Sequence, residues 1–300
     1  MIYCVSDIHG RIDLFERLLE TINFSNNDTI YVLGDSIDRG GGFAVLEKII
    51  KLQEKGQAKF IQGNHEINFV SNVSKLNNSV VSELYYGDLF FESKRRRNRV
   101  SFSDEYKHMV KQQELFQQFR DSVNAATNLT QYESYLSCEE YFNSYELEER
   151  KKVIDFISSA PTYIDIEVNM HKFRLLHAGC NSDGKTNLYI REEFYKNPNP
   201  LENTTIIFGH TTTKDIRMQI DGVYSQPSIW YDNRNNNDKI GIDCGCCFAG
   251  GKLACLRLDD MKEFYVDNDK LTAFPFSKLN DYFYNNQYSM SKLKEDIWSL

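Results

Sequence analysis

Five short polar blocks along the chain carry side-chain types that bind metal ions through oxygen and nitrogen. In chain order they are Asp7-Ile8-His9, Gly34-Asp35 with Asp38-Arg39, Gly63-Asn64-His65-Glu66, His177-Ala178-Gly179 and Gly209-His210. A mixed set of carboxylate, amide and imidazole ligands suits Mn²⁺, Fe or Zn²⁺ rather than a structural cysteine site. The blocks offer six candidate ligands, more than one tetrahedral ion takes, so two ions that share a carboxylate fit the pattern better.

Each of the first three blocks follows a short apolar run that predicts a β-strand. These runs cover residues 2–6, 29–33 and 58–62, and apolar residues at helical spacing lie between them, so the first third of the chain is predicted to be a βαβαβ unit. Such units form a largely parallel sheet with right-handed crossovers. Ligands of an open α/β sheet gather outside the carboxyl ends of its strands, so we expect the three blocks to converge at one site.

The middle and the end of the chain differ in character from these blocks. Residues 70–160 are first rich in Asn and Ser, then carry a basic run at 94–99 and polar stretches with aromatic residues at roughly helical spacing. This pattern predicts a mostly helical insert at about 71–159, and short strand patterns return from residue 162. We expect a single α/β domain over residues 1–300, with a core at 1–70 and 160–265 and a C-terminal extension at about 266–300.

Composition restricts the classes of function. The 300 residues are 41% hydrophobic and 26% charged, which is ordinary for a globular protein. The formal net charge of -8 argues against a non-specific binder of nucleic acid or membrane surfaces, and the sequence has neither a leader pattern nor an apolar run of membrane length. Seven cysteines at irregular spacing suit a reducing compartment better than a disulfide framework. We therefore expect a cytoplasmic protein that does not bind membranes.

In this order, and each after a predicted strand, the five blocks resemble those of the calcineurin-like metallophosphoesterases. The likeness is greater to their serine/threonine phosphoprotein phosphatase branch, including its short bacterial and phage members, and it covers residues 1–70 and about 160–260. The resemblance implies a four-layer αββα fold, in which a β-sandwich is flanked by helices. It also implies two divalent metal ions, with Mn²⁺ first and Fe or Zn²⁺ as alternatives, and direct attack on phosphorus by a hydroxide that both ions hold.

The resemblance divides the six matching ligand positions between two ions. Asp7 and His9 would hold the first ion, Asp35 would bridge both, and Asn64, His177 and His210 would hold the second. Many members of the superfamily carry another histidine two residues after the last of these positions, whereas this chain has Thr212 there. Water would complete the first ion's coordination instead, as in the phosphoprotein phosphatase branch.

The resemblance also assigns the groups that would act on the substrate. His65 would be the general acid, oriented by Asp38. Arg39 and Arg191 would donate hydrogen bonds to the phosphoryl oxygens, which carry negative charge in the transition state. For Glu66, by contrast, we expect a role in supporting the ligands rather than in catalysis.

Two features outside the blocks have more than one explanation. The cluster Cys244, Cys246 and Cys247 could bind a soft metal or sense oxidation, but we expect small residues that fill a turn near the active site. The basic run at 94–99 could be a solvated surface, a docking site for an acidic or phosphorylated substrate, or a nucleic-acid contact.

Three functions are weighed against these observations. The leading hypothesis is a metal-dependent phosphomonoesterase that removes phosphate from phosphoserine and phosphothreonine, and also phosphotyrosine, in proteins. The alternative is a symmetrical diadenosine tetraphosphate hydrolase or another nucleotide phosphoesterase, whose family shares nearly all of these blocks. A regulatory binding protein without activity is disfavoured because every expected metal ligand is present. The expected partner is a phosphoprotein or another phosphate ester, without nucleic acid, and the oligomeric state is not predicted.

Overall fold

The computed structural model describes residues 1–39, 43–75, 142, 145–223, 225–248 and 250–268. The predictions for most of the insert, for the basic run at 94–99 and for residues 269–300 fall outside the described residues. The division into core, insert and extension therefore stays a prediction. None of the helices that the structure describes is long and apolar enough to cross a membrane, and the cytoplasmic location also stays a prediction.

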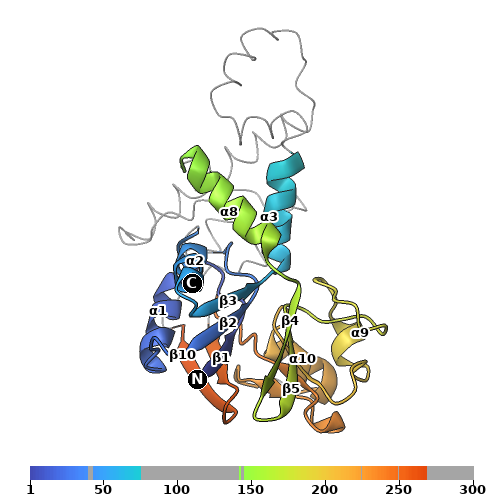
Figure 1. Ribbon diagram of the computed structural model, residues 1–300. Coiled ribbons are helices and arrows are strands. Elements are labelled where there is room, and N and C mark those ends of the chain that lie inside the picture. The colour runs from blue at the N-terminus through green and yellow to red at the C-terminus, as the bar shows by residue number, and fades with distance from the viewer. Residues whose placement is uncertain (40–42, 76–141, 143–144, 224, 249, 269–300) are drawn as a thin grey trace, which may run out of the picture.

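The first of two sheets begins with the βαβαβ unit that the apolar runs predict. Strands β1 (Ile2–Val5), β2 (Thr29–Leu33) and β3 (Ala58–Ile61) are parallel neighbours. Helices α1 (Ile12–Thr21) and α2 (Ala44–Glu54) connect them and lie together beside the sheet (Figure 1). The carboxyl ends of these strands therefore face the same edge of the sheet.

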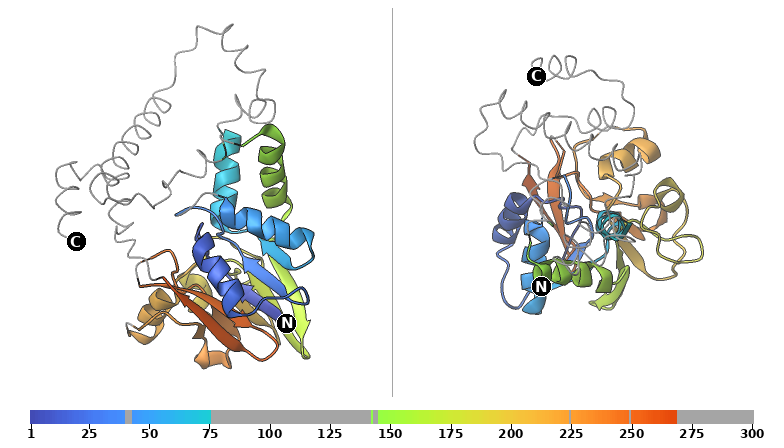
Figure 2. Two further views of the ribbon diagram at one scale, coloured as in Figure 1. Left: turned by 90° about the vertical axis from the view of Figure 1, so that its left-hand side faces the viewer. Right: turned by 90° about the horizontal axis from the view of Figure 1, so that it is seen from above.

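Segments from the end of the described chain complete this sheet. Strand β9 (Lys252–Arg257) pairs antiparallel with β1, and β10 (Lys262–Asp267) pairs antiparallel with β9, which gives the strand order β10-β9-β1-β2-β3. Beyond β3, helix α3 (Asn64–Lys75) begins at once and packs against α8 (Leu147–Ser159). The two helices stand side by side above the sheet (Figures 1 and 2).

The second sheet has the order β4-β5-β6-β8-β7. Its strands are β4 (Tyr163–Val168), β5 (His171–Leu176), β6 (Thr205–Phe208), β7 (Trp230–Tyr231) and β8 (Lys239–Gly241). The three middle strands are parallel, and the edge strands β4 and β7 are antiparallel to their neighbours. The carboxyl ends of β5, β6 and β8 thus lie at one edge of this sheet, as those of β1 to β3 do in the first.

Two helices and a short 3₁₀ helix accompany the second sheet. They are α9 (Glu192–Tyr195), α10 (Thr213–Asp221) and η1 (Asn233–Asn235). The side-chain oxygen of Thr212 accepts a hydrogen bond from the backbone N–H of Asp215 and so caps the start of α10. The helix ends at Gly222, whose φ of 66° is the left-handed conformation that glycine adopts without strain.

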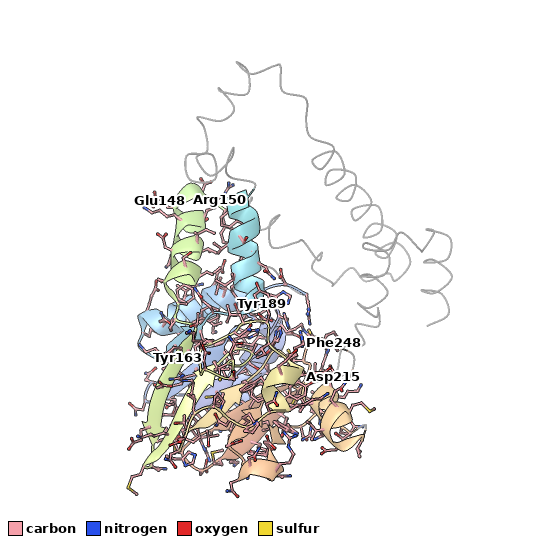
Figure 3. All side chains as sticks on the ribbon, turned by 90° about the vertical axis from the view of Figure 1, so that its right-hand side faces the viewer. Glu148, Arg150, Tyr163, Tyr189, Asp215 and Phe248 are labelled. Carbon is pink, nitrogen blue, oxygen red and sulfur yellow. The ribbon has the colours of Figure 1, made fainter. Side chains whose placement is uncertain are left out.

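Side chains of successive strand residues point to opposite faces of each sheet, and this alternation gives the fold four layers. In β1, Tyr3 and Val5 pack in the apolar cluster that contains α1 and α2, whereas Cys4 between them packs in the cluster between the sheets. In β6, Ile207 joins the cluster between the sheets, and its two neighbours pack towards α9 and α10. Because successive strand side chains point to opposite faces, both sheets are buried on both faces, and side chains fill the space between the ribbons (Figure 3). The predicted αββα sandwich is confirmed.

Candidate metal centre

Left-handed backbone marks the loops that carry the candidate ligands. Six of the residues that the sequence nominates have φ between 49° and 65°: Asp7, His9, Asp35, Asp38, Arg39 and His210. Residues other than glycine pay about 1–3 kcal/mol for rare backbone conformations, which persist where the surrounding structure imposes them. Loop bonds from Asp7 N–H to the Gly34 carbonyl (3.2 Å) and from His9 N–H to the Asp35 carbonyl (2.9 Å) hold these turns together.

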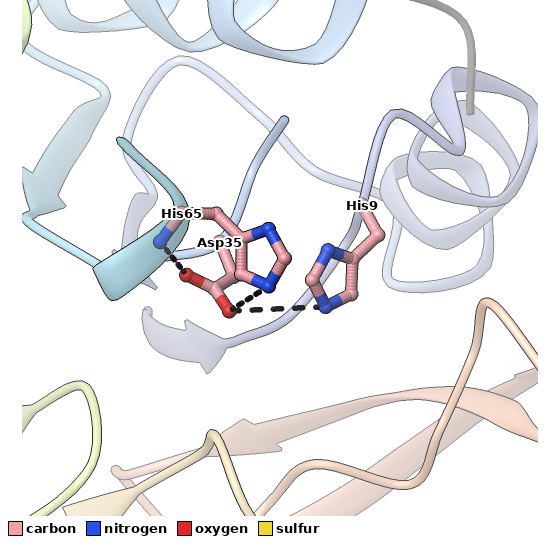
Figure 4. A group of neighbouring side chains, drawn as sticks. All are labelled: His9, Asp35 and His65. Atoms are coloured by element: carbon pink, nitrogen blue, oxygen red, sulfur yellow. Dashed lines mark hydrogen bonds and ion pairs between the residues drawn. The ribbon is translucent and has the colours of Figure 1, made fainter. Parts of the chain in front are cut away.

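One group of candidate ligands gathers around Oδ2 of Asp35. His9 Nε2 lies 3.8 Å and His65 Nε2 lies 3.7 Å from this oxygen (Figure 4). His9 Nε2 is also 3.9 Å from Asp7 Oδ1. The other ring nitrogen of His9 lies 3.1 Å from the carbonyl oxygen of Ile37, and if it donates there, Nε2 of the neutral ring keeps a free lone pair.

A second group gathers around Oδ1 of the same carboxylate. His177 Nε2 lies 3.4 Å from Asp35 Oδ1 and 2.9 Å from Asn64 Oδ1, while its Nδ1 lies 2.8 Å from the carbonyl oxygen of Leu33. The rings of His177 and His210 stand 5.0 Å apart between their centroids. The backbone N–H of His210 donates to Asp7 Oδ2 (2.9 Å), which links this group to the first. Asp35 thus lies in both groups.

The chemistry of these residues fits divalent cations. His210 Nε2 is buried and has no hydrogen-bond partner among the described residues, although buried polar atoms are nearly always paired. Burial, with neighbouring carboxylates adding to it, raises the pKa of Asp7 to about 6 and that of Asp35 to about 7. Burial lowers the pKa of His210 to about 2, and the positive charges of the His177 and Arg191 side chains add to this shift. Cations at this place would satisfy the crowded carboxylates and use the lone pairs of neutral histidines.

His65 of the first group makes further polar contacts, and two arginines lie beside the two groups. His65 Nδ1 lies 2.6 Å from Asp38 Oδ2, and its Nε2 lies 3.5 Å from Arg39 Nη2. Burial opposes the charged form of His65, but the hydrogen bond to Asp38 and the charges of the nearby carboxylates outweigh it and raise the pKa. Arg191 Nη1 donates to the carbonyl oxygen of His210 (2.9 Å). The structure therefore brings all ten nominated residues into one network, while the role of each stays a prediction.

Glu66 supports this network from behind. Its buried carboxylate accepts hydrogen bonds from the backbone N–H groups of Gly63 (3.1 Å), Asp35 (2.9 Å) and Ser36 (2.7 Å), and from the Ser36 hydroxyl (2.9 Å). Gly63 leaves no room for a side chain, because a Cβ there would lie 2.3 Å from the backbone nitrogen of Asp35. The carboxylate thus ties the loop after β2 to the start of α3.

Asp243 is a buried carboxylate of the site that the sequence analysis did not nominate. Its Oδ1 accepts a hydrogen bond from the backbone N–H of Gly245 (2.8 Å), and burial, followed by the charge of Asp7, raises its pKa to about 8. Asp243 lies two residues after β8, a middle strand of the second sheet. The rule that ligands gather at carboxyl ends of strands applies to Asp243 as well, but the three residues of β8 give only a weak signal in the sequence.

The nearby cysteines behave as buried small residues. Cys244, Cys246 and Cys247 are buried, and burial raises the pKa of Cys244 and of Cys247 to about 12. Cys246 Sγ lies 3.1 Å from the carbonyl oxygen of Asp7 and packs under that loop. Neither group of candidate metal ligands among the described residues includes a cysteine, and the role of these cysteines as turn-filling residues stays a prediction.

Comparison with known proteins relates this site to phosphoesterases. The sequence pattern of the calcineurin-like phosphoesterases matches residues 1–214. The symmetrical bis(5'-nucleosyl)-tetraphosphatase of Wigglesworthia glossinidia brevipalpis is 27% identical over 289 residues, which cover 88% of this chain and 98% of the relative. The enzyme of the same name from Acidovorax ebreus is 46% identical over 72 residues, 23% of this chain and 25% of the relative. A crystal structure described as a candidate diadenosine tetraphosphatase shares the fold, with a TM-score of 0.51, 17% identity and coverage of 89% of this chain and 92% of that one.

These relatives overturn the leading functional prediction. The chain was expected to dephosphorylate phosphoserine and phosphothreonine proteins, but the relatives matched over nearly its whole length are named as tetraphosphatases of nucleotides. The error has a physical reason. The polar blocks bind metal ions and phosphoryl oxygens, which a phosphoprotein and a nucleotide both present, so the blocks cannot distinguish the two substrates.

Proposed function

The chain belongs to the calcineurin-like phosphoesterase family, and from this premise we propose that it is a hydrolase that cleaves dinucleoside tetraphosphates symmetrically into two nucleoside diphosphates. The observation that carries the proposal is the 27% identity to a symmetrical bis(5'-nucleosyl)-tetraphosphatase across 98% of that relative's length. Agreement over the whole length includes the segments between the polar blocks, where substrate choice must reside.

We propose that the two groups around Asp35 hold two divalent ions, with Mn²⁺ as the first choice. His9 and Asp7 would hold one ion, and His177, His210 and Asn64 the other. When bound, two such ions supply a nucleophile at neutral pH and neutralise charge on the phosphoryl oxygens. The protein's part is to fix the ligand atoms, which the hydrogen bonds of the two buried histidines to the backbone carbonyls of Ile37 and Leu33 support.

The remaining polar groups would orient the substrate and move a proton. His65, protonated and held through Nδ1 by Asp38, presents Nε2–H as a donor for the oxygen of the departing nucleoside diphosphate. Arg39 and Arg191 would bind the phosphate chain through charge-assisted hydrogen bonds. Arg191 is anchored to the His210 carbonyl and to Thr211 Oγ1 (3.2 Å), so its guanidinium is placed before the substrate arrives.

An assay of products tests the proposal. Protein loaded with Mn²⁺ is incubated with diadenosine tetraphosphate and, separately, with a phosphoserine peptide, and metal-stripped protein serves as the blank. We expect ADP as the nucleotide product and faster turnover of diadenosine tetraphosphate than of the peptide. Formation of ATP and AMP would contradict symmetrical cleavage, and no turnover by protein that contains two metal ions would reject the nucleotide substrate.

A further inference from the structure

Phe248 is an exposed aromatic side chain at the end of a buried loop segment. It is 39% exposed, whereas Cys244, Cys246 and Cys247 before it are each at most 6% exposed. The chain is therefore buried up to this ring, and Gly250 beyond it is exposed. A flat apolar ring that is open to solvent beside a polar site offers a surface on which another flat ring can stack.

Three hydrogen bonds hold the backbone N–H and carbonyl groups of Phe248. Its N–H donates to the carbonyl of Gly245 (2.9 Å), and its carbonyl accepts from the Gly251 N–H (3.0 Å) and from Asn268 Nδ2 (3.0 Å). The ring lies over Gly245, where a Cβ would approach Phe248 Cδ2 to 3.3 Å. Binding to a surface that is already ordered avoids much of the entropy loss of ordering a mobile one.

Arg39 connects this ring to the candidate metal centre. Its guanidinium carbon lies 5.3 Å from the centroid of the Phe248 ring, within the range of a cation–π contact. Nη2 of the same guanidinium lies 3.5 Å from Nε2 of His65. An apolar ring, a cation and a proton donor thus follow one another away from the loop. A nucleoside diphosphate has a flat base, then a ribose, then a chain of negatively charged phosphates. Its base and phosphates therefore follow the same order as the ring of Phe248 and the cation of Arg39.

We propose that Phe248 is the platform on which an adenine base of the substrate stacks while Arg39 binds the adjoining phosphates. The proposal rests on the proposed function, because only a nucleotide brings a base to this place. Tyr189 is the competing ring: it is 53% exposed, but its hydroxyl donates to Asn68 Oδ1 (2.8 Å), so its polar end is already engaged. In Figure 3, Tyr163 lies on the left, Phe248 on the right and Tyr189 between them.

Binding measurements isolate the contribution of the base. Protein loaded with Mn²⁺ is titrated calorimetrically with ADP and with ribose 5-diphosphate, which lacks only the adenine. Because stacking of one base on an aromatic side chain typically changes affinity about 5- to 150-fold, we expect ADP to bind more tightly by a factor in that range. Phe248→Leu should remove most of this preference by weakening ADP binding alone, and Phe248→Trp should retain it.

Tyr163→Leu is the matched control. Tyr163 is also an exposed ring with a guanidinium over it, that of Arg174 at 4.2 Å, but it lies on the edge strand β4. This variant should keep the preference for ADP.

Three results would overturn the proposal: equal binding of the two ligands by the unaltered protein, equal weakening of both by Phe248→Leu, or loss of the preference in Tyr189→Leu alone. Failure of the proposed function is seen separately, as an absence of ADP release from diadenosine tetraphosphate, because the binding experiment does not depend on turnover.

Discussion

Replacing Glu66 by Gln tests whether one buried carboxylate holds the candidate metal centre in shape. Glutamine has nearly the same size, so the substitution creates no cavity. It removes one negative charge and changes what the two terminal atoms can accept. Oε2 of Glu66 accepts from the backbone N–H groups of Asp35 and Gly63, and Oε1 accepts from Ser36 N–H, Ser36 Oγ and, at 3.4 Å, Ile37 N–H. An amide keeps one oxygen and places an NH₂ group against donors on the other side.

The magnitude follows from the hydrogen bonds that cannot be kept. If the amide nitrogen takes the place of Oε2, the N–H groups of Asp35 and Gly63 lose their acceptor, and a buried donor left without a partner costs about 1–3 kcal/mol. Two such losses predict that Glu66→Gln lowers the free energy of unfolding by about 2–6 kcal/mol. This is a large fraction of the roughly 5–15 kcal/mol that stabilises a typical domain.

Urea unfolding in the presence of a chelator measures this loss, because bound metal ions would otherwise stabilise the folded state by mass action. The matched control is Glu16→Gln. Glu16 is exposed, and its one ion pair within the described part of the chain is with Lys48, at 3.3 Å. Its substitution should therefore change the free energy of unfolding by less than about 0.5 kcal/mol. A loss below about 1 kcal/mol for Glu66→Gln, with an unchanged m-value, would refute the argument that this carboxylate is needed by the loop donors.

Three further substitutions separate the metal centre from the rest of the fold. Asp35→Ala should abolish activity and remove bound metal, and near-normal metal content by elemental analysis would contradict the shared ligand. His65→Asn should keep both ions and lose about 10²- to 10⁴-fold in turnover on alkyl phosphates. The loss should be smaller on diadenosine tetraphosphate, because its diphosphate leaving group needs less protonation. Equal loss on both substrates would contradict the role of His65 as a general acid. Asp232→Asn leaves the fully buried Lys239, 3.1 Å away, without its counter-charge and should cost about 3–5 kcal/mol at pH 7. Burial raises the pKa of Asp232, but Arg234 and Lys239 outweigh it and hold the pKa below its usual value. The difference in unfolding free energy between the unaltered protein and the variant should therefore be at its maximum above about pH 4 and decrease as the pH falls further. A difference that stays constant down to pH 2 in chemical unfolding would contradict this.

The part of the candidate site that follows β1, β2 and β3 could be located from the sequence by local patterns and one topological rule. Asp7, Asp35 and Asn64 each follow an apolar run, and β1, β2 and β3 are parallel neighbours, so their carboxyl ends had to meet. The prediction needed no side-chain coordinates, because parallel pairing of short apolar runs fixes both the direction of each strand and the edge at which it ends.

Other parts of the site depend on contacts that leave no local pattern. Arg191 reaches the centre through the carbonyl oxygen of His210, nineteen residues further along the chain, and neither residue type nor spacing reveals that contact. Strand β7 has only two residues, too few for a period to appear. Asp243 follows a three-residue strand, so the rule that located the other carboxylates had almost no apolar run on which to act.

The activity by which the relatives are named was missed from the sequence. The side chains that bind metal ions are not the ones that touch the rest of a substrate. The site favours the binding of metal cations, because Asp7 and Asp35 are buried and His210 is neutral. Metal cations attract any phosphate ester. Discrimination must therefore come from side chains that touch the rest of the substrate, and these have no need to be ionisable. Phe248 is such a residue: it carries no charge and belongs to no polar block, yet it contacts the guanidinium next to His65. A search of a sequence for reactive groups passes over residues of this kind, whereas their exposure beside a buried site makes them visible in the structure.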